Sequence, residues 1–358
     1  MNKEYSLNLL KKLTESKGIS GFEDETVAIV RQECQSLGQL SEDSMRNVYV
    51  CSNKNKGNRP IMQLDAHTDE VGFVVQAIKP NGTLKILNMG SWIAHNVPAH
   101  KVYVRNKYGK YITGIVASTP PHFMSEAERN APLSMNALSV DIGARSKEEA
   151  ETSFGIRIGE PIVPAVDFEY DSEHDIMISK AFDNRLGCAA IIDTLRALEN
   201  EDINVDLVGT FSSQEEVGAR GAKLSATQAN ADIAIIFEGC PADDTSVEGY
   251  MIQTALKKGP MLRHVDVSMI TNPRWQRFAL DVAEELSIPV QEAVRSGGGT
   301  NGSQIHVANR GVPAIVIGIP VRYAHTHYGI SSFEDYSNAV KLAVEIIKRI
   351  NKDIIFSF

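Results

Sequence analysis

The chain has 358 residues, of which 43% are hydrophobic, and carries a formal net charge of −9. This length can bury a large core, either in one domain with an insertion or in two domains. The acidic balance excludes the basic footprint of a nucleic-acid-binding protein. Since no run of about 18 apolar residues could cross a bilayer, we expect peptides or small molecules as partners, with neither nucleic acid nor membrane.

The start of the chain predicts two amphipathic helices, at residues 3–17 and 23–37, where apolar positions recur at helical spacing. This segment lacks the continuous apolar stretch of a signal peptide. The four cysteines are scattered and form no Cys-x-x-Cys pair. We therefore expect a cytoplasmic protein with reduced thiols and no thiolate zinc site.

The distribution of strand-like and helix-like segments along the chain predicts two domains. Residues 71–164 carry short β-rich runs and turns without long helical patterns, which indicates a small, β-barrel-like domain. This domain is inserted into a discontinuous catalytic domain formed by residues 1–70 and 165–358. Around the insertion, strands at 47–50 and 60–64 are expected before it, and apolar strands alternate with helices after it.

The second part of the catalytic domain predicts a parallel sheet. Its expected strands are 206–211, 233–237 and 314–318, and its expected helices are 184–199, 273–286 and 333–350. Buried strands that alternate with helices are typical of a mostly parallel sheet covered on both faces. The fold class is therefore α/β, with a three-layer α/β/α catalytic domain.

Metal-capable side chains follow the expected strands. They are His67, the pair Glu215 and Glu216, Glu238, and His325. In open α/β sheets, ligands bind beyond the carboxyl ends of the strands, so topology should bring these groups together. Asp183 adds a fifth candidate ligand at the start of a helix.

Two histidines, three carboxylates and no thiolate make a set suited to zinc, cobalt or manganese. A bridging carboxylate, for which Asp183 is the candidate, fits two divalent ions about 3.5 to 4 Å apart. Taken singly, Asp183 has an ordinary interpretation as a helix N-cap, and His67 and His325 as structural histidines. The combination favours a metal site.

The neighbouring carboxylates Glu215 and Glu216 point in different directions at a strand end and can take different tasks. We predict that Glu216 binds metal and that Glu215 is the general base, which takes a proton from a metal-bridging water and passes it to the leaving amine. Asp69 should hold the imidazole of His67 through a hydrogen bond. A solvated Gln-Glu-Glu turn is the structural alternative.

The glycine run that ends in Gly298, Gly299 and Thr300 lacks the Gly-Lys-Ser/Thr of a phosphate loop. We interpret it as a tight loop lining a substrate pocket, with a plain flexible turn as the alternative. Arg322 is a further candidate for substrate binding, because it could contact an acidic side chain, as could Arg220 and Arg295. For any one of these arginines, a solvated or structural role is the favoured interpretation.

The ordered motifs of the chain resemble metallopeptidase family 42, the glutamyl and tetrahedral aminopeptidases. They are His67-Thr68-Asp69-Glu70-Val71-Gly72, Ala181-Phe182-Asp183-Asn184-Arg185, Ser213-Gln214-Glu215-Glu216-Val217-Gly218-Ala219-Arg220-Gly221-Ala222, Gly259-Pro260, Gly298-Gly299-Thr300-Asn301 and Arg322-Tyr323-Ala324-His325. They span nearly the whole chain, and the Gln-Glu-Glu-Val-Gly stretch is highly specific. The resemblance implies a metal-dependent aminopeptidase that removes N-terminal residues from peptides.

The resemblance also implies how the metals are shared. His67 and Glu238 would complete one site, Glu216 and His325 the other, and Asp183 would bridge both. It further implies that the inserted domain builds homo-oligomers, because many relatives form twelve-subunit tetrahedral shells, which are dodecamers.

Three positions depart from the family pattern. Glu238 stands where an aspartate is usual, Asn301 replaces the aspartate of Gly-Gly-Thr-Asp, and His327 follows His325 closely enough to compete with it as a ligand. His325 matches the motif and is the predicted ligand.

Other functions stay open from the sequence. The same site type occurs in deacylases and carboxypeptidases, and a noncatalytic relative could retain the fold. A glycosidase is disfavoured, because adjacent carboxylates cannot easily face each other across a glycosidic bond.

Overall fold

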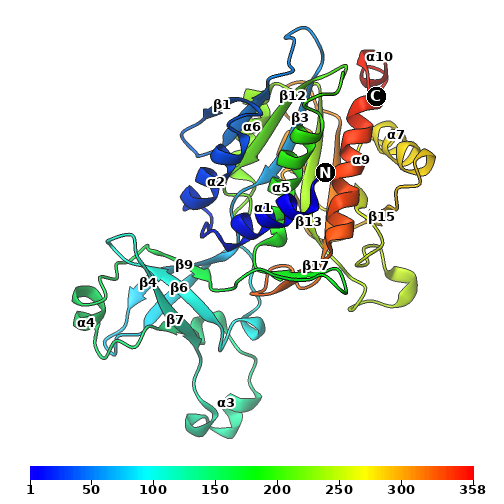
Figure 1. The fold of residues 1–358 in the computed structure, drawn as a ribbon. Helices are drawn as coiled ribbons and strands as arrows, with labels where there is room; N and C mark the ends of the chain where they lie inside the picture. Colours follow the sequence, from blue (N-terminus) through cyan, green and yellow to red (C-terminus); the bar gives the residue numbers. More distant parts are fainter.

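The computed structural model describes residues 1–358 and shows a large α/β domain with a smaller β barrel beside it (Figure 1). The sheet of the large domain has eight strands in the order β1 (Gly38–Glu42), β2 (Val48–Ser52), β12 (Asp206–Ser212), β3 (Ile61–His67), β13 (Ile233–Pro241), β16 (Ala314–Val321), β14 (Met261–Val265) and β15 (Gln291–Val294). The four central strands, from β12 to β16, are parallel, whereas β2 and β14 run antiparallel to their inner neighbours. The prediction of a mostly parallel sheet is confirmed at its centre.

The central strands bury both of their faces because apolar residues occupy successive positions. In β13, Ile235 and Phe237 join the larger core, while Ala234 and Ile236 join a separate core on the opposite face. Such alternation is expected of a strand with helices on both sides. The predicted three-layer α/β/α architecture is therefore confirmed.

Helices cover the two faces unequally. The larger core receives residues from α1 (Lys3–Glu15), α2 (Asp24–Cys34), α5 (Phe182–Ala197), α7 (Pro273–Glu285), α9 (Phe333–Arg349) and α10 (Lys352–Ile355). The opposite face is covered by α6 (Arg220–Ala229) and α8 (Gly302–Ile305). Neither α6 nor α8 was expected from the sequence, since both are short and follow loops rich in polar residues.

The inserted segment forms a closed six-stranded barrel with its own core of 19 buried residues. Its strands lie in the order β4 (Gly72–Ile78), β5 (Leu84–Met89), β8 (Ser139–Asp141), β7 (Tyr111–Ala117), β6 (Lys101–Arg105) and β9 (Pro161–Pro164), accompanied by the short helices α3 (Glu126–Asn130) and α4 (Lys147–Thr152). Closure removes the unpaired strand edges that would otherwise invite aggregation. The β-barrel-like part of the predicted fold class is confirmed.

A small antiparallel sheet lies where the barrel meets the large domain (Figure 1). It consists of β10 (Glu169–Asp171), β11 (Ile176–Ser179) and β17 (Gly329–Ser331). Ser179 pairs with Gly329, so the segment that leads into Asp183 runs beside the segment that leaves His325. The pairing brings together two candidate ligands that lie far apart in the sequence.

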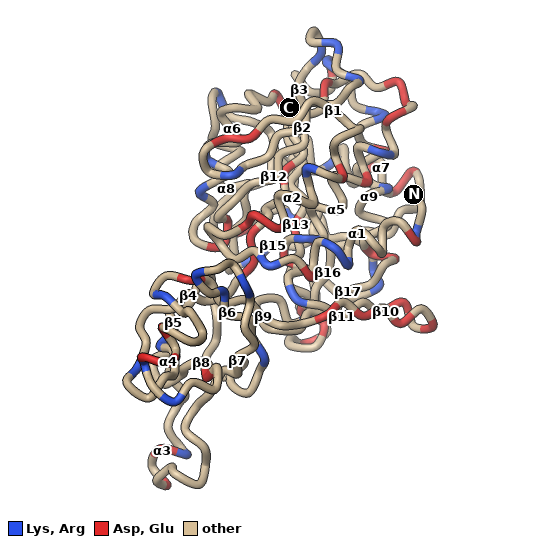
Figure 2. The backbone as a smooth tube through the Cα atoms, turned by 60° about the vertical axis from the view of Figure 1, so that its left-hand side comes forward, with Lys and Arg blue, Asp and Glu red and all other residues tan.

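Lys and Arg are interspersed with Asp and Glu along the chain (Figure 2). No helix is both long and apolar enough to cross a membrane.

Candidate metal centre and active site

His67 ends β3, and its side chain is almost completely buried. Its Nδ1 lies 3.1 Å from the backbone oxygen of Asp69. Because a carbonyl oxygen only accepts, this contact places the hydrogen on Nδ1 and turns Nε2 toward other ligands. That nitrogen lies 3.0 Å from Asp183 Oδ1 and 3.3 Å from Glu238 Oε1.

His325 is oriented in the same way by the barrel segment. Its Nδ1 lies 3.0 Å from the backbone oxygen of Ser91. Its Nε2 is then directed at Asp183 Oδ2, 3.2 Å away, and at Glu216 Oε2, 3.3 Å away. Ser91 was not expected at the site, because no sequence pattern marks a backbone oxygen that meets a side chain 234 residues later.

Asp183 lies between the two histidines, since one of its carboxylate oxygens faces His67 and the other faces His325. Two sets of three side chains, His67–Asp183–Glu238 and Asp183–Glu216–His325, each place their ligand atoms within 4.8 Å of one another. The peptide bond between Asp183 and Asn184 is cis. The structure thus brings together all five residues that the sequence proposed as ligands.

Glu238 differs from the expectation in its position along the chain. It lies within β13, which continues to Pro241, instead of following the strand. Neighbouring Gly318 in β16 pairs with it in register. The strand is longer than expected because the carboxylate is buried together with His67 and Asp183, so a polar residue does not mark the strand's end.

The donor set fits divalent cations. Both carboxylate oxygens of Glu238 and Oε1 of Glu216 are buried without any hydrogen-bond partner. Buried, unpaired carboxylate oxygens are costly unless a cation or donor compensates them. Imidazole nitrogens and carboxylates are also the ligands that zinc and its neighbours accept.

The pKa values reflect the same crowding. Burial, followed by the charge of Asp183, raises the pKa of Glu238 to about 8. Burial alone would lower the pKa of His325, but the carboxylates of Glu216 and Asp183 raise it to about 10. For Asp183, burial would raise the pKa, but the two histidines hold the pKa of this carboxyl below its usual range. In each case the charges of neighbouring groups add to or oppose the effect of burial, because the carboxylates and imidazoles are packed closely together.

Glu215 belongs to neither set of three. Its Oε2 lies 3.9 Å from His67 Nε2, and its side chain lines the neighbouring cavity. Burial and the nearby carboxylates of Asp183 and Asp69 raise its pKa to about 7, against the influence of His67. A carboxylate with a pKa near neutrality can both accept and release a proton.

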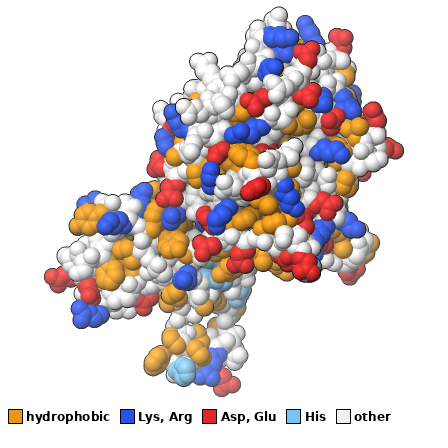
Figure 3. Space-filling view, in the orientation of Figure 1, with side chains coloured by type: hydrophobic (Ala, Val, Ile, Leu, Met, Phe, Trp, Pro, Cys, Tyr) orange, Lys and Arg blue, Asp and Glu red, His pale blue; other side chains and the backbone are white.

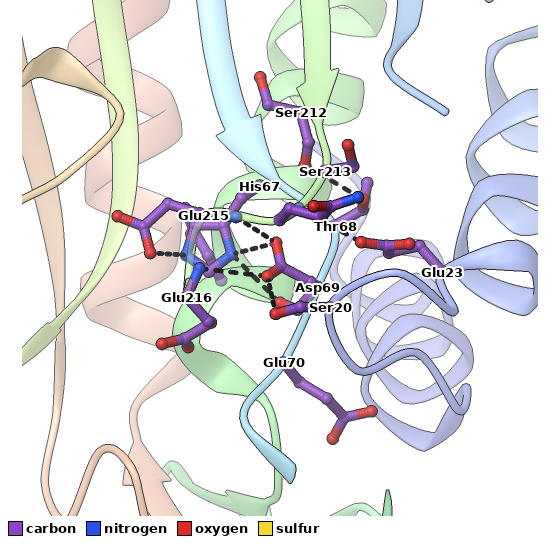
Figure 4. Close-up of polar contacts among 12 residues, drawn as sticks. Ser20, Glu23, His67, Thr68, Asp69, Glu70, Ser212, Ser213, Glu215 and Glu216 are labelled. Carbon is purple, nitrogen blue, oxygen red and sulfur yellow. Dashed lines mark hydrogen bonds and ion pairs between the residues drawn. The ribbon is translucent and has the colours of Figure 1, made fainter. Parts of the chain in front are cut away.

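The Asp69 carboxylate has more partners than the sequence suggested. Its Oδ1 lies 3.4 Å from His67 Nδ1, while the closer contact of that nitrogen is to the Asp69 backbone. The same carboxylate accepts the backbone N–H groups of Glu215 and Glu216 at 2.9 and 3.1 Å (Figure 4). Asp69 therefore contacts both a candidate ligand and the turn that carries the candidate base.

A cavity of about 770 Å³ is lined by Glu215 and by four of the five candidate ligands, Asp183, Glu216, Glu238 and His325. Gly298, Gly299 and Thr300 line it, as expected for a loop at a substrate pocket. Arg322 does not line it, because its guanidinium pairs with Asp244 at 2.6 and 2.9 Å. The arginines that do line it are Arg263 and Arg295, together with several serines.

His327 lies apart from the ligand cluster. Its ring is buried, and it stacks on His100 of the barrel segment with ring centroids 4.1 Å apart. Burial lowers the pKa of His327 to about 3, so the ring is neutral. The structure directs His325, and not His327, toward Asp183.

The chain matches known proteins along most of its length. The model of the family described as M42 glutamyl aminopeptidase matches residues 47–342. The glutamyl aminopeptidase of Lactococcus lactis is 31% identical over 345 residues, with 96% of each chain covered.

Two solved structures extend this similarity to the fold. The TET aminopeptidase of a marine-sediment thaumarchaeote has a TM-score of 0.95 and 34% identity, covering 100% of this chain and 99% of that one. The TET1 peptidase of Pyrococcus horikoshii, described as assembling into a tetrahedron or a large octahedral shell, has a TM-score of 0.86 and 26% identity, covering 96% and 100%. The barrel and the α/β domain are therefore shared with these structures.

Proposed function

The chain belongs to the M42 glutamyl aminopeptidase family, whose members are hydrolases acting on peptide bonds. We propose that it removes N-terminal amino acids from peptides. The reaction would use two divalent metal ions, with Glu215 as the general base. One ion would be held by His67, Asp183 and Glu238. The other would be held by Asp183, Glu216 and His325. Zinc, cobalt or manganese suits this donor set.

The proposal rests on the arrangement of the candidate ligand atoms. Two sets of histidine and carboxylate ligands share Asp183, and three of their buried oxygens lack any donor. A structural ion-pair network would satisfy those oxygens with lysine, arginine or amide groups. Arg263, which lines the neighbouring cavity, is instead paired with Asp266 at 2.8 Å.

When bound, the divalent ions would polarise the scissile carbonyl and make water more acidic. Glu215, which lines the cavity without ligating in either set, would take the proton of the attacking water. It would then deliver that proton to the nitrogen of the leaving amine. Its position suits both transfers, because it lines the cavity beside the two ligand sets and its carboxylate is free of any ligand role.

The assembly we propose is a homo-oligomer built through the barrel, with a dodecamer as the expected form. Large hydrophobic side chains stay exposed on the inserted segment, including Leu87, Tyr108 and Ile158, and orange patches mark this region in Figure 3. Exposed apolar side chains favour association where they gather into a patch. Light scattering should then report about twelve times the 39.2 kDa chain mass.

A cytoplasmic location agrees with the state of the cysteines. All four are free, and three of them are buried. Proteins of oxidising compartments more often pair their cysteines.

The test is hydrolysis of a panel of aminoacyl chromogenic substrates and their N-acetylated forms by metal-stripped protein, with zinc, cobalt or manganese added back. Metal-dependent cleavage of the free-amine forms alone supports an aminopeptidase. Cleavage of the blocked forms would instead indicate a deacylase or an endopeptidase. No cleavage with any of the metals would contradict the catalytic role.

A further inference from the structure

The turn that carries Glu215 and Glu216 is held by side chains from other parts of the chain. Four consecutive backbone N–H groups, at residues 213–216, each donate to a buried side-chain acceptor. Asn47 accepts the first at 2.8 Å, Glu23 the second at 3.2 Å, and Asp69 the last two. No hydrogen bond of regular secondary structure serves these donors.

Glu23 has no part in the proposed chemistry, yet it is 2% exposed and lies at the start of α2. One of its oxygens accepts both Gly21 N–H, at 2.8 Å, and Gln214 N–H. Its side chain points toward the turn from the side opposite to the cluster of His67 and Glu216 (Figure 4). Neither lysine nor arginine pairs with it, and burial, followed by the charge of Asp69, raises the pKa of Glu23 to about 7.

The turn needs such support because of its backbone conformation. Gln214 has a φ of 55°, in the left-handed region. For a residue with a side chain, this conformation is disfavoured, because Cβ approaches the backbone carbonyl oxygen. Hydrogen bonds to the N–H of Gln214 and of its neighbours offset that cost and fix the direction in which the next two side chains leave the backbone.

From this geometry, and on the basis of the function proposed above, we propose that Glu23 is a positioning residue: together with Asp69 it fixes the backbone of the 214–216 turn and so places the Glu215 carboxylate against the substrate cavity. Glu23 does not touch the substrate. It acts through the N–H of Gln214, next to the general base.

The chain offers a conservative variant and a matched control. Glu23→Gln keeps an oxygen that can accept the same two N–H groups, whereas Glu23→Ala leaves them without a partner. Glu33→Ala is the control, since Glu33 lies in the same helix and is nearly buried, but it bonds Tyr5 and Lys12, far from the turn. Its loss should affect stability alone.

The experiment measures kcat, KM, bound metal and thermal unfolding for the metal-loaded wild type and the three variants. We expect Glu23→Ala to lower kcat by about 10- to 100-fold, the cost of a base displaced by a fraction of an ångström to 1 Å. KM and metal content should stay near wild type, and Glu23→Gln should recover most of the rate. In Glu23→Ala, amide hydrogen exchange at residues 214–216 should become faster.

Three results would overturn the positioning role. They are a kcat of Glu23→Ala within threefold of wild type, an equal loss of kcat in Glu33→Ala, and a Glu23→Gln variant as slow as Glu23→Ala. Failure of the proposed function would look different, because the wild type would then show no metal-dependent cleavage of free-amine substrates, and failure of the general-base role alone would leave Glu215→Gln active. An active Glu23→Ala beside an inactive Glu215→Gln refutes only the role of Glu23.

Discussion

Glu215→Gln is the most direct test of the chemistry, because it removes a proton acceptor with little change in shape. The Glu215 carboxylate forms no hydrogen bond with the protein, and its nearest ionic partner, His67 Nε2, is 3.9 Å away. The amide therefore leaves no donor unsatisfied. It also removes a negative charge from the vicinity of Asp183 and Asp69, whose charges raise the pKa of Glu215.

Glu215→Gln should have a large effect on kcat and a small effect on the free energy of unfolding. General base catalysis contributes about 10²- to 10⁴-fold, so kcat should fall by that factor, which corresponds to about 3–5 kcal/mol in the activation free energy. The free energy of unfolding should change by less than about 1 kcal/mol, since no packing or hydrogen bond is lost. Metal content should stay at the wild-type level, because Glu215 belongs to neither ligand set.

The assay compares kcat on an aminoacyl chromogenic substrate with bound metal and the urea unfolding midpoint, for wild type and Glu215→Gln prepared in parallel. Glu216→Gln is the matched variant one residue along. It should lose metal as well as activity, since Glu216 faces His325 at 3.3 Å. The reasoning would be refuted by a Glu215→Gln kcat within tenfold of wild type, or by a loss of metal equal to that of Glu216→Gln.

Three further changes test the structure around the site. Asp183→Ala should abolish binding of both ions in a metal-content assay, because it removes the shared ligand, whereas His325→Gln should retain one; equal metal contents would contradict the bridging role. Lys180→Met should destabilise the fold by about 3–5 kcal/mol in urea, because the buried Glu70 loses its partner at 2.6 Å and keeps only Arg185, at 3.5 Å, and the Gly18 N–H. Adding Glu70→Gln should restore much of the loss, and no recovery would contradict the importance of this pair. Burial raises the pKa of Asp193 above 3.8, so the folded chain holds more protons between the unfolded and folded values. Relative to Asp193→Asn, the wild type should therefore gain stability as pH falls through that window, by up to about 1.4 kcal/mol per pH unit, and a pH-independent difference would contradict this.

The sequence alone determined the fold class and the set of candidate ligands. Apolar runs such as residues 233–237 are long enough to mark buried strands, and polar clusters after them mark the carboxyl edge of the sheet. Periodicity, however, could not place the short helices α6 and α8, whose few residues carry little pattern. It also ended β13 one residue before Glu238, because a buried carboxylate resembles a loop residue in the sequence.

The tertiary structure decided how the candidate residues meet. Pairing of Ser179 with Gly329 brings Asp183 near His325, and the backbone oxygen of Ser91 accepts from His325 Nδ1, which orients the ring so that Nε2 faces Asp183. These contacts join segments that are 150 and 234 residues apart. The spacing of apolar residues within a segment indicates whether that segment forms a helix or a strand, but it does not show which segments become neighbours in the fold.

The same limit explains Glu23 and Arg322. In the sequence, Glu23 is an ordinary acidic residue at a helix start, and Arg322 is a plausible contact for an acidic substrate. In the fold, Glu23 accepts Gln214 N–H behind the candidate base, while Arg322 is paired with Asp244. The sequence by itself determined the chemistry that the residues can perform; only the tertiary structure decided which of them face the cavity, because burial and partners depend on the packing of distant segments.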